Sequence, residues 1–441
     1  MKIIHCLNIF WPDQIAGTEL YAWALIKALK TLGIESVVVI PNYGKTVTET
    51  FEINKLKVIR YAEPSTVDRS LIMGKRVAEG VAAFVEVLLT EQASVVHFHE
   101  LKGSNGLSLH HVKAAKQNGF KTMMTFHLAG YSCKTGTLMY KERELCDGVI
   151  DTARCTDCAL PLNNNGVVHK AVYVAGRVLH KLDYDSTSWN NAAGTALGFP
   201  FVIEKINADL HALAGSCDRL VVYANWYKRI LVLNGIPGQK VSYVAPGLKA
   251  CGPYNIVAKA LLGGKIRLVF VGRINAFKGI DLMIAAVAAM PADKISLDIY
   301  GHINEDEFTK KCLEAAASNS NIQFKGPLQS EVVVNVMSEY DVFCLASAFS
   351  EMSPLVIQEA FAAGLPVLAS NVYGNRELIT HDKNGWLFQF KNIESLKEVL
   401  RELIVNPAKV EQAKTNLPEV RPFEKVAEEY LALYNEILAH S

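Results

Sequence analysis

Short apolar runs alternate with helical segments along most of the 441-residue chain. A first series extends to about residue 247 and includes KIIHCLNIF, ESVVVIP, ASVVHFHE and KTMMTFHL. A second series starts at about residue 265 and includes KIRLVFVGR, KISLDIYGH, NIQFKGPL, YDVFCLAS and LPVLASN. Because neighbouring parallel strands need a long crossover connection, which is usually a helix, this alternation predicts mostly parallel sheets with helices on both faces. Two series of this length predict two α/β domains.

A segment that contains the breakers Gly252 and Pro253 precedes the second series, so the boundary is expected near 245–260. We expect three parts: an N-terminal domain over residues 1–250, a C-terminal domain over 251–420, and a final amphipathic helix over 421–441. Between about 131 and 210 the alternation stops, which predicts an insertion in the first domain. Open parallel sheets bind ligands beyond the carboxyl ends of their strands, so functional residues are expected just after the strand runs.

Charge and hydropathy exclude several classes of protein. The 45 Lys and Arg residues balance the 44 Asp and Glu residues, so no long-range field favours a nucleic-acid partner. No apolar run approaches the roughly 20 residues needed to cross a bilayer. The N-terminal MKIIHCLNIFWPD is interpreted as a first strand and not as a signal peptide, because it lacks the apolar core and cleavage site of one. We expect a cytoplasmic protein with reduced thiols, since nine cysteines is an odd number and five of them are scattered.

Two glutamates eight positions apart lie in the segment SAFSEMSPLVIQEAFAAGLPV, which follows the strand run YDVFCLAS. Ser353 is expected to cap a helix, with Pro354 at its first position and Gly364 just beyond its end. Glu351 would then lie just outside the helix and Glu359 in its second turn. At the rise of an α-helix, the two residues are roughly 8–10 Å apart along the axis.

This spacing allows the two carboxylates to hold different parts of one elongated ligand. The helix N-terminus between them offers the amides of Leu355 and Val356 to an anion. A nucleotide sugar fits this arrangement, because its phosphates lie between two groups that carry hydroxyls. One acid would bind the sugar, the amides would bind phosphate, and the other acid would bind the ribose. The alternative is a pair of solvated acids, Glu351 at a helix N-terminus and Glu359 on the surface.

A second cluster of charged residues follows another strand run, in VFVGRINAFKG. There Arg273 and Lys278 flank a loop that also contains Gly272 and Gly279. Two cations at the carboxyl end of a strand suit a diphosphate, one as a planar fork and one as a point charge. They would also stabilise the charge that develops on a departing diphosphate. The alternative is a pair of exposed basic loop residues.

Both clusters, in this order, resemble the motifs of the family 4 glycosyltransferases of GT-B fold, the large retaining group. That family carries a strand, Gly-Arg, loop, Lys-Gly element and later two glutamates separated by seven residues. The stretch GLPVLASNVYGNREL with KNGWLF is similar to the family's following segment, and AGTELY and TFH resemble its first loop and a histidine-bearing strand end. The resemblance implies a GT-B α/β fold, with two Rossmann-like parallel-sheet domains facing a central cleft. It also implies that the chain crosses back near its end, so that the final helix packs on the first domain.

The resemblance also implies roles for individual residues. Arg273 and Lys278 would bind the donor diphosphate, Glu351 would contact the donor sugar, and Glu359 would bind the ribose. His127, at the end of KTMMTFH, would lie at the reaction centre and polarise a hydroxyl or donate a hydrogen bond. The implied catalytic group is His127, Glu351, Arg273 and Lys278. The implied donor-binding group is Gly17, Gly272, Arg273, Lys278, Glu351, Ser353, Pro354, Leu355 and Glu359.

The sequence departs from the family pattern at three places near these motifs. Met352-Ser353 stands where the family usually has a glycine soon after the first glutamate, Ala16 precedes Gly17 where two glycines are usual, and Pro246-Gly247 stands for Asn-Gly. None of these departures removes a charged group of the implied site. They bear on the shape of the donor pocket.

Two further histidines, His97 and His99, end the strand run ASVVHFHE. Alternate residues of a strand share a face, so the pair could bind a metal, although no further ligand is expected nearby. A structural or acceptor-side role is the favoured interpretation.

Four cysteines lie together in the insertion, and two of them form a Cys-x-x-Cys pair. This spacing predicts a structural zinc site formed by Cys133, Cys146, Cys155 and Cys158. The alternatives are four free thiols, two oxidisable pairs or a redox-active Cys-x-x-Cys. Similar cysteines recur in some members of the family that the chain resembles.

The insertion also contains the helical segment VVHKAVYVAGRVLHKL, which has an apolar stripe beside several basic residues. It is interpreted either as an ordinary packed helix or as a helix that lies on a membrane surface. Many glycosyltransferases of the family elongate lipid-linked glycans, and this resemblance implies peripheral association with the inner face of the membrane.

The resemblance implies a retaining transferase that moves a sugar from a UDP- or GDP-sugar to a glycan or lipid-linked glycan, in bacterial polysaccharide biosynthesis. No cofactor is expected for catalysis, and a structural zinc ion is the candidate metal. Two alternatives stay open: a nucleotide-sugar epimerase of the same architecture and a non-catalytic nucleotide-sugar binder. Product analysis without an acceptor separates an epimerase from a transferase, because an epimerase needs no acceptor.

Overall fold

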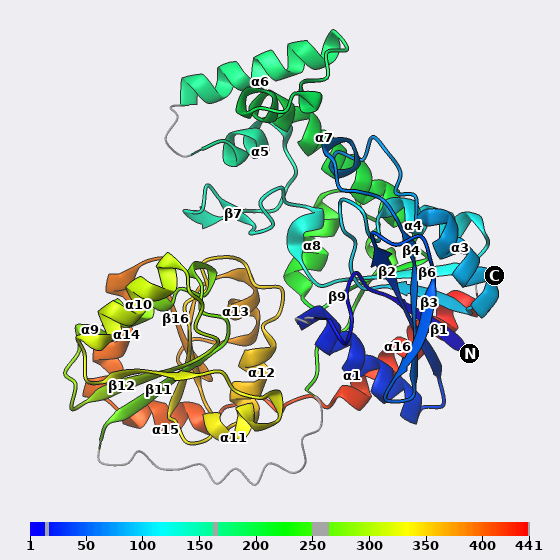
Figure 1. Cartoon of the computed structure of the whole chain (residues 1–441). Coiled ribbons are helices and arrows are strands. Elements are labelled where there is room, and N and C mark those ends of the chain that lie inside the picture. Colours follow the sequence, from blue (N-terminus) through cyan, green and yellow to red (C-terminus); the bar gives the residue numbers. More distant parts are fainter. Residues whose placement is uncertain (14–16, 162–165, 249–263, 440–441) are drawn as a thin grey trace. The chain divides into compact units, whose positions relative to one another are not determined.

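The computed structural model describes residues 1–13, 17–161, 166–248 and 264–439 (Figure 1). The chain divides into two compact units, each of which is described by itself. Unit 1 comprises Met1–Lys141, Asp147–Ala245 and Phe423–Ser441, and unit 2 comprises Glu142–Cys146 and Pro246–Pro422. The sequence predicted domain boundaries after residues 250 and 420. The expected breakers Gly252 and Pro253 lie outside the described residues.

Unit 1 contains an eight-stranded sheet in the order β10-β9-β6-β5-β1-β2-β4-β3. The neighbouring strands are parallel except for the pair β3 and β4. The strands are β1 (Lys2–Cys6), β2 (Glu35–Tyr43), β3 (Glu49–Ile53), β4 (Leu56–Glu63), β5 (Val95–Phe98), β6 (Lys121–Phe126), β9 (Arg219–Val222) and β10 (Val241–Tyr243). The central strands β1 and β5 are almost entirely buried, as expected for parallel strands covered on both faces.

Unit 1 also contains helices outside the insertion. They are α1 (Gly17–Thr31), α2 (Arg69–Ile72), α3 (Val81–Glu91), α4 (Leu109–Gln117), α8 (Asn225–Leu233) and the final helix α16 (Phe423–Ala439). Short 3₁₀ turns cover Ala129–Tyr131 and Gly238–Lys240.

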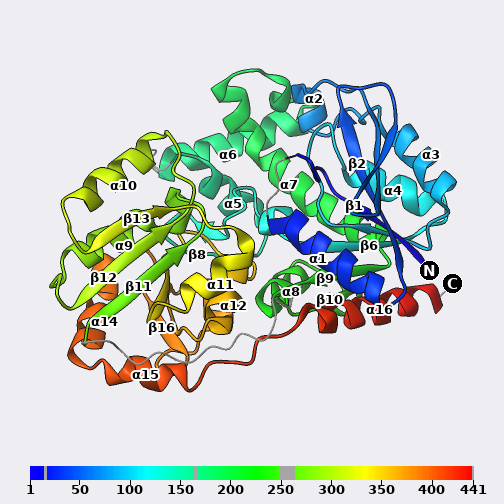
Figure 2. The ribbon, with the colours of Figure 1, turned by 60° about the horizontal axis from the view of Figure 1, so that its bottom comes forward.

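The final helix α16 is part of unit 1, where it runs beside α1 (Figure 2). Its residues Val426, Tyr430 and Tyr434 are fully buried. The Tyr430 hydroxyl lies 3.1 Å from Thr125 Oγ1 on β6 and 3.5 Å from the Tyr21 hydroxyl on α1. The apolar stripe read from the sequence is therefore the face that packs on unit 1.

The insertion is mainly helical, with α5 (Thr152–Ala159), α6 (Gly166–Lys181) and α7 (Ala192–Ser216), two short strands, β7 (Met139–Tyr140) and β8 (Glu144–Leu145), and a 3₁₀ turn at Ser186–Ser188. Helix α6 packs closely on α7, since a Cβ atom on Gly176 would collide with the carbonyl oxygen of Leu197. Helix α7 is 25 residues long and contains Pro200. The sequence did not predict this helix, because glycine and proline have low helix propensity.

Unit 2 contains a six-stranded, fully parallel sheet in the order β13-β12-β11-β14-β15-β16. Its strands are β11 (Ile266–Val271), β12 (Ile295–Tyr300), β13 (Ile322–Gly326), β14 (Val342–Leu345), β15 (Val367–Ser370) and β16 (Gly385–Phe388). Its helices are α9 (Ile280–Ala288), α10 (Glu307–Ala317), α11 (Val333–Met337), α12 (Leu355–Ala362), α13 (Tyr373–Leu378), α14 (Ile393–Val405) and α15 (Ala408–Lys414), with 3₁₀ turns at Ala276–Lys278 and Ser330–Val332.

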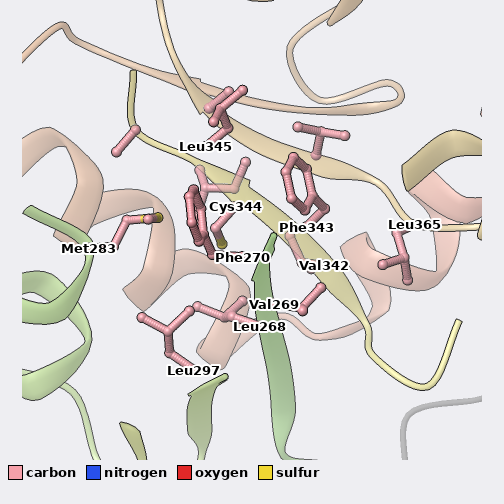
Figure 3. Close-up of a cluster of buried hydrophobic side chains, with 14 of the residues drawn as sticks. Leu268, Val269, Phe270, Met283, Leu297, Val342, Phe343, Cys344, Leu345 and Leu365 are labelled. Atoms are coloured by element: carbon pink, nitrogen blue, oxygen red, sulfur yellow. The ribbon is translucent and has the colours of Figure 1, made fainter. Parts of the chain in front are cut away.

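The core of unit 2 is built on its two central strands, β11 and β14. Figure 3 shows their side chains, among them Leu268, Phe270, Phe343 and Cys344, all of which are buried in one cluster. A rigid core of this kind fixes the positions of the loops that follow the two strands. Within the described part of the chain, no helix is both long enough and apolar enough to cross a membrane.

Candidate functional site

The first group of predicted site residues lies in unit 2, where the loops after β11 and β14 meet. Gly279 ends the first loop with a φ of +63°, and a Cβ atom there would collide with the carbonyl oxygen of Ala346 in the second loop. Only glycine tolerates both this conformation and this close approach. The Ala348 amide also donates to the Phe277 carbonyl at 2.8 Å. The glycine of the Lys278-Gly279 motif thus allows the loop after β11 to pack against the loop after β14.

This contact of the loops brings Lys278 and Glu351 together. The Lys278 ammonium lies 2.5 Å from Glu351 Oε1, and Ser347 Oγ donates to the same oxygen at 2.8 Å. The two side chains are only 16% and 10% exposed, so the pair is largely removed from water. The sequence assigned Lys278 to the diphosphate and Glu351 to the sugar. The structure shows that they form one polar cluster, and it adds Ser347, which sequence reasoning missed.

Arg273 is the unpaired cation of this region. It is the second residue after β11, next to Gly272, and it is exposed. Across the described parts of the chain, its guanidinium makes no hydrogen bond or ion pair. A guanidinium that no carboxylate neutralises is suited to bind a phosphate group with two parallel hydrogen bonds.

Helix α12 carries the second predicted acid and begins one residue later than expected. Pro354 is its N-cap residue, the helix starts at Leu355, and no side chain caps it. The expected cap by Ser353 is therefore wrong, because the extended backbone at Pro354 already forms the helix entry. The amides of Leu355 and Val356 belong to the first turn of the helix, where backbone N–H groups have no acceptor within the helix. They remain available to an anion.

Glu359 lies in the second turn of α12, as predicted, and its side chain is half-buried. Burial raises the pKa of its carboxyl group from 4.5 to about 7. Its carboxylate has no hydrogen-bond or ion-pair partner in the ranges that the structure describes. A desolvated acid without a partner does not stabilise the fold. Such acids are typical of binding sites, where a ligand supplies the partner.

The second group of predicted site residues lies in unit 1 and is a chain of histidines. The parallel register aligns His5 of β1 with His97 of β5, and His99 follows β5. His5 Nδ1 lies 3.0 Å from His99 Nε2, and His99 Nδ1 lies 3.3 Å from His127 Nε2. Burial lowers the pKa of all four imidazoles below the ordinary value of 6.5. The four histidine rings are therefore neutral near pH 7, and each has one donor and one acceptor nitrogen.

Hydroxyl groups complete the hydrogen bonds of these histidines. His97 places its two nitrogens 2.7 Å from the Tyr434 hydroxyl and 2.7 Å from Thr125 Oγ1. The Tyr223 hydroxyl lies 2.9 Å from His127. The final helix α16 thus supplies a partner that orients the site, through a residue far away in the sequence.

His5, His97 and His99 place one nitrogen each within 4.8 Å of one another, and no other such group of three potential metal ligands occurs in the described residues. The expectation that no further ligand lies near His97 and His99 is therefore wrong. Sequence reasoning missed His5, although the pairing of β1 with β5 could have indicated it. The hydroxyl partners of His97 already account for both of its nitrogens, so hydrogen bonding explains the cluster without a metal.

Gly17 is the first residue of α1 and is exposed, with open space around the position of a Cβ atom. Ala16 lies outside the described residues. The four cysteines of the insertion are all half-buried, and no three of them form such a group of potential metal ligands in the described residues. The Lys141 amide lies 3.3 Å from Cys158 Sγ, and burial, opposed by this bond, raises the pKa of that thiol.

A cavity of about 490 Å³ lies in unit 1 beside His99 and His127. Its walls come from the loops after β5 and β6 and from helices α2, α4 and α7. The predicted reaction-centre histidine therefore faces a cavity that is large enough for a small ligand.

A family model and several curated proteins match part of this chain. Residues 255–420 match the model of the family "Glycosyl transferases group 1". The amylovoran biosynthesis glycosyltransferase AmsK of Erwinia amylovora is 24% identical over 216 residues, which are 47% of this chain and 53% of AmsK. The chain spans about half the length of the curated relatives that it matches.

Solved structures are similar over the whole chain. Sucrose-phosphate synthase from Thermosynechococcus elongatus has a TM-score of 0.65 at 15% identity, with 100% of both chains covered. Anabaena HepE in complex with UDP-glucose has a TM-score of 0.59 at 14% identity, with 100% of this chain and 98% of HepE covered. The predicted GT-B fold with two Rossmann-like domains is confirmed. Unit 2 contains most of the segment that matches the group 1 glycosyltransferase family, so the resemblance to GT-B glycosyltransferases is confirmed as well.

Proposed function

We propose that this protein is a retaining family 4 glycosyltransferase that moves a sugar from a UDP- or GDP-sugar to a glycan or lipid-linked glycan in bacterial polysaccharide biosynthesis. The observation that carries the proposal is the set of charged groups at the carboxyl ends of β11 and β14 and on α12. Three features together match the parts of a nucleotide sugar: an exposed arginine and a half-buried glutamate, neither with a partner in the described residues, and a largely buried lysine–glutamate pair. Two similar proteins support this proposal. AmsK is named as a glycosyltransferase of amylovoran biosynthesis, and HepE was solved in complex with UDP-glucose.

In the proposed reaction, Arg273 and the first amides of α12 bind the diphosphate, and Glu359 accepts hydrogen bonds from the ribose. Lys278 and Glu351 bind as a unit at the junction of diphosphate and sugar. The bond from the anomeric carbon to the diphosphate breaks with its electron pair on the diphosphate, and the acceptor oxygen forms the new bond. The proton of the acceptor hydroxyl passes to the departing diphosphate. Fixed cations at this point would stabilise the developing charge.

A panel of UDP-, GDP-, ADP- and TDP-sugars, screened by thermal shift, identifies the donor. Product analysis with and without a glycan acceptor then tests the reaction. An acceptor-dependent product with the anomeric configuration of the donor supports the proposal. Interconversion of sugars without an acceptor would assign an epimerase, and donor binding without turnover on any acceptor would assign a non-catalytic binder.

The roles of the two acids can be tested separately. Glu359→Ala is expected to weaken the binding of free nucleoside diphosphate about tenfold or more, because the ribose loses its acceptor. Glu351→Ala is expected to act chiefly on the nucleotide sugar. The opposite pattern would show that the ligand runs in the opposite direction along α12.

We also propose that Cys133, Cys146, Cys155 and Cys158 bind one structural zinc ion. A thiol that accepts a backbone hydrogen bond, as Cys158 does, suits a metal-bound thiolate. Elemental analysis of protein purified without chelators tests the site. One zinc per chain supports it, and a folded, metal-free sample would leave the four cysteines as thiols.

Peripheral membrane binding is a further part of the proposal. Helix α6 exposes Val167, Val174 and Val178 by 76%, 57% and 49%, on a helix that also carries Lys170 and Lys181. Exposed apolar residues with neighbouring cations suit an anionic membrane surface. Cosedimentation with vesicles that contain anionic lipid, lost on Val174→Asp, would support this role.

A further inference from the structure

The cavity beside His127 differs from the donor region in the charge of its lining. Four cations line it, Arg76, Lys102, Lys113 and Lys205, against two carboxylates, Glu100 and Asp209. The formal excess is therefore two positive charges. All of these residues belong to unit 1, so the cavity is complete within one compact part of the chain.

Two of the four cations are already paired with carboxylates. Arg76 binds Asp68 and Glu79 at 3.1 and 3.2 Å, and Lys205 binds Asp209 at 2.6 Å. These pairs account for one of the two carboxylates in the cavity lining. Among the described residues, Lys102 and Lys113 form no ion pair of this kind.

Lys102 and Lys113 carry the uncompensated charge. Within the described residues, neither ammonium forms a hydrogen bond or an ion pair with a carboxylate, and Lys102 lies 4.6 Å from the centre of the Tyr43 ring. The remaining acid of the lining is Glu100, whose pKa is raised by burial and then by Glu19, whereas Asn8 and the charge of Lys102 oppose this shift. Two lysines therefore stand against one carboxylate that is partly offset by Lys102. The pKa of His110 is lowered chiefly by burial, then by Lys113 and Lys205, and Asp209 opposes this shift. Cations that protein acids do not neutralise favour an anionic ligand.

The rest of the cavity lining is largely apolar and includes Leu71, Leu101, Leu109, Leu128, Leu210 and Leu213. A volume of about 490 Å³ with an apolar wall and a few polar groups is typical of a small-molecule site. His99 and His127 stand at the same cavity, so a ligand bound to the two lysines lies next to the proposed reaction centre.

We propose that this cavity is the acceptor site and that it selects an acceptor sugar bearing an anionic group, a phosphate or a carboxylate, which Lys102 and Lys113 bind. This inference rests on the proposed glycosyl transfer and specifies the chemical class of its acceptor. The hydroxyl that receives the new sugar faces His127, and the anionic group sets the orientation of the acceptor.

Ligand-observed NMR at low ionic strength tests the proposal with glucose 6-phosphate, glucuronate and glucose as probes. Wild-type protein is expected to bind at least one of the two anionic sugars at least tenfold more tightly than glucose. The phosphate and carboxylate probes distinguish the two sources of the anion. The affinity should fall as sodium chloride is added, because charge–charge attraction is screened.

Variants connect the binding to the two lysines. Lys102→Ala with Lys113→Ala is expected to remove the preference for the anionic sugar, whereas Lys113→Arg retains it. The matched control is Lys30→Ala, which removes a lysine from a different cavity of unit 1. Equal binding of glucose and both anionic sugars would overturn the proposal. So would unchanged binding in the double variant, an equal loss in the Lys30→Ala control, or no binding of any probe.

The same samples separate this proposal from the proposed function. The affinity for nucleoside diphosphate is measured in parallel, because that site lies in unit 2. A double variant that keeps nucleotide affinity and loses the anionic sugar supports the acceptor assignment. If wild-type protein binds the anionic sugar through the two lysines but binds no nucleotide, the cavity assignment stands as an anion site and the glycosyltransferase proposal fails.

Discussion

Glu359→Gln is expected to stabilise the ligand-free protein, and to do so only above about pH 5. The carboxyl pKa is raised from 4.5 to about 7 by burial in the folded state, whereas an unfolded chain has the ordinary value. Between these two pH values the folded state binds more protons than the unfolded state, so stability falls as pH rises through this window. A glutamine carries no charge and does not have this penalty.

The expected size follows from the shift in pKa. A change from 4.5 to about 7 corresponds to about 3.5 kcal/mol at most, since one unit is worth about 1.4 kcal/mol. Glu359 is half-buried and retains some contact with water, so about 2 kcal/mol is the expected gain at pH 8. Near pH 4.5 the variant and the wild type should differ by only a few tenths of a kcal/mol.

Hydrogen exchange of unit 2 peptides measures this difference without assuming that the whole chain unfolds in one step. Variant and wild type are compared at the same pH, at pH 5, 6, 7 and 8, and the exposed Glu398→Gln on α14 is the control. A stabilisation of Glu359→Gln that does not depend on pH, or a loss of stability at pH 8, would refute the reasoning. The same variant should bind nucleoside diphosphate more weakly, so that its stability and its binding change in opposite directions.

Further changes probe other parts of the molecule. Arg273→Ala and Lys278→Ala should each lower turnover by about 100-fold or more, on the order of 3 kcal/mol of transition-state stabilisation, and near-normal steady-state rates would contradict the diphosphate assignment. His99→Phe should lower kcat about tenfold with little change in nucleotide affinity, because it removes a hydrogen bond that orients His127, and an equal change in both parameters would indicate a general loss of structure. Removal of the chain after Pro422 should abolish hydrogen-exchange protection in unit 1, and loss confined to unit 2 would show that α16 has no role in the stability of unit 1.

The sequence predicted the parallel sheets because buried parallel strands are short, continuous apolar runs. It did not indicate the pair β3 and β4, since β3 has only exposed and half-buried residues and therefore lacks an apolar run. Helix α7 was missed for a different reason. Its glycines and Pro200 lower helix propensity, and the packing on α6 compensates for this.

Positions in the donor region were predictable where the signal is local. The place of Glu359 in the second turn of α12 followed from helix geometry alone. The pair of Lys278 and Glu351 did not, because the two residues are 73 positions apart and meet only where two strands end side by side. His5 was missed for the same reason, since its relation to His97 depends on strand order. Local motifs therefore place residues within one helix or loop, whereas strand order determines which residues of different elements touch.

The two units differ in the kind of chemistry that their side chains can supply. Unit 2 supplies the charged groups of the proposed donor site. These are Arg273, which has no partner among the described residues, and the pair of Lys278 and Glu351, and together they can bind and stabilise a diphosphate. In unit 1, burial lowers the pKa of His127 and His99 below 6.5, so near pH 7 both rings are neutral. A neutral His127 does not act as a cationic acid. It donates or accepts one hydrogen bond, and its contact with His99 restricts which nitrogen carries the proton. The proposed reaction therefore takes its charge stabilisation from unit 2, and His127 contributes the orientation of a hydroxyl group.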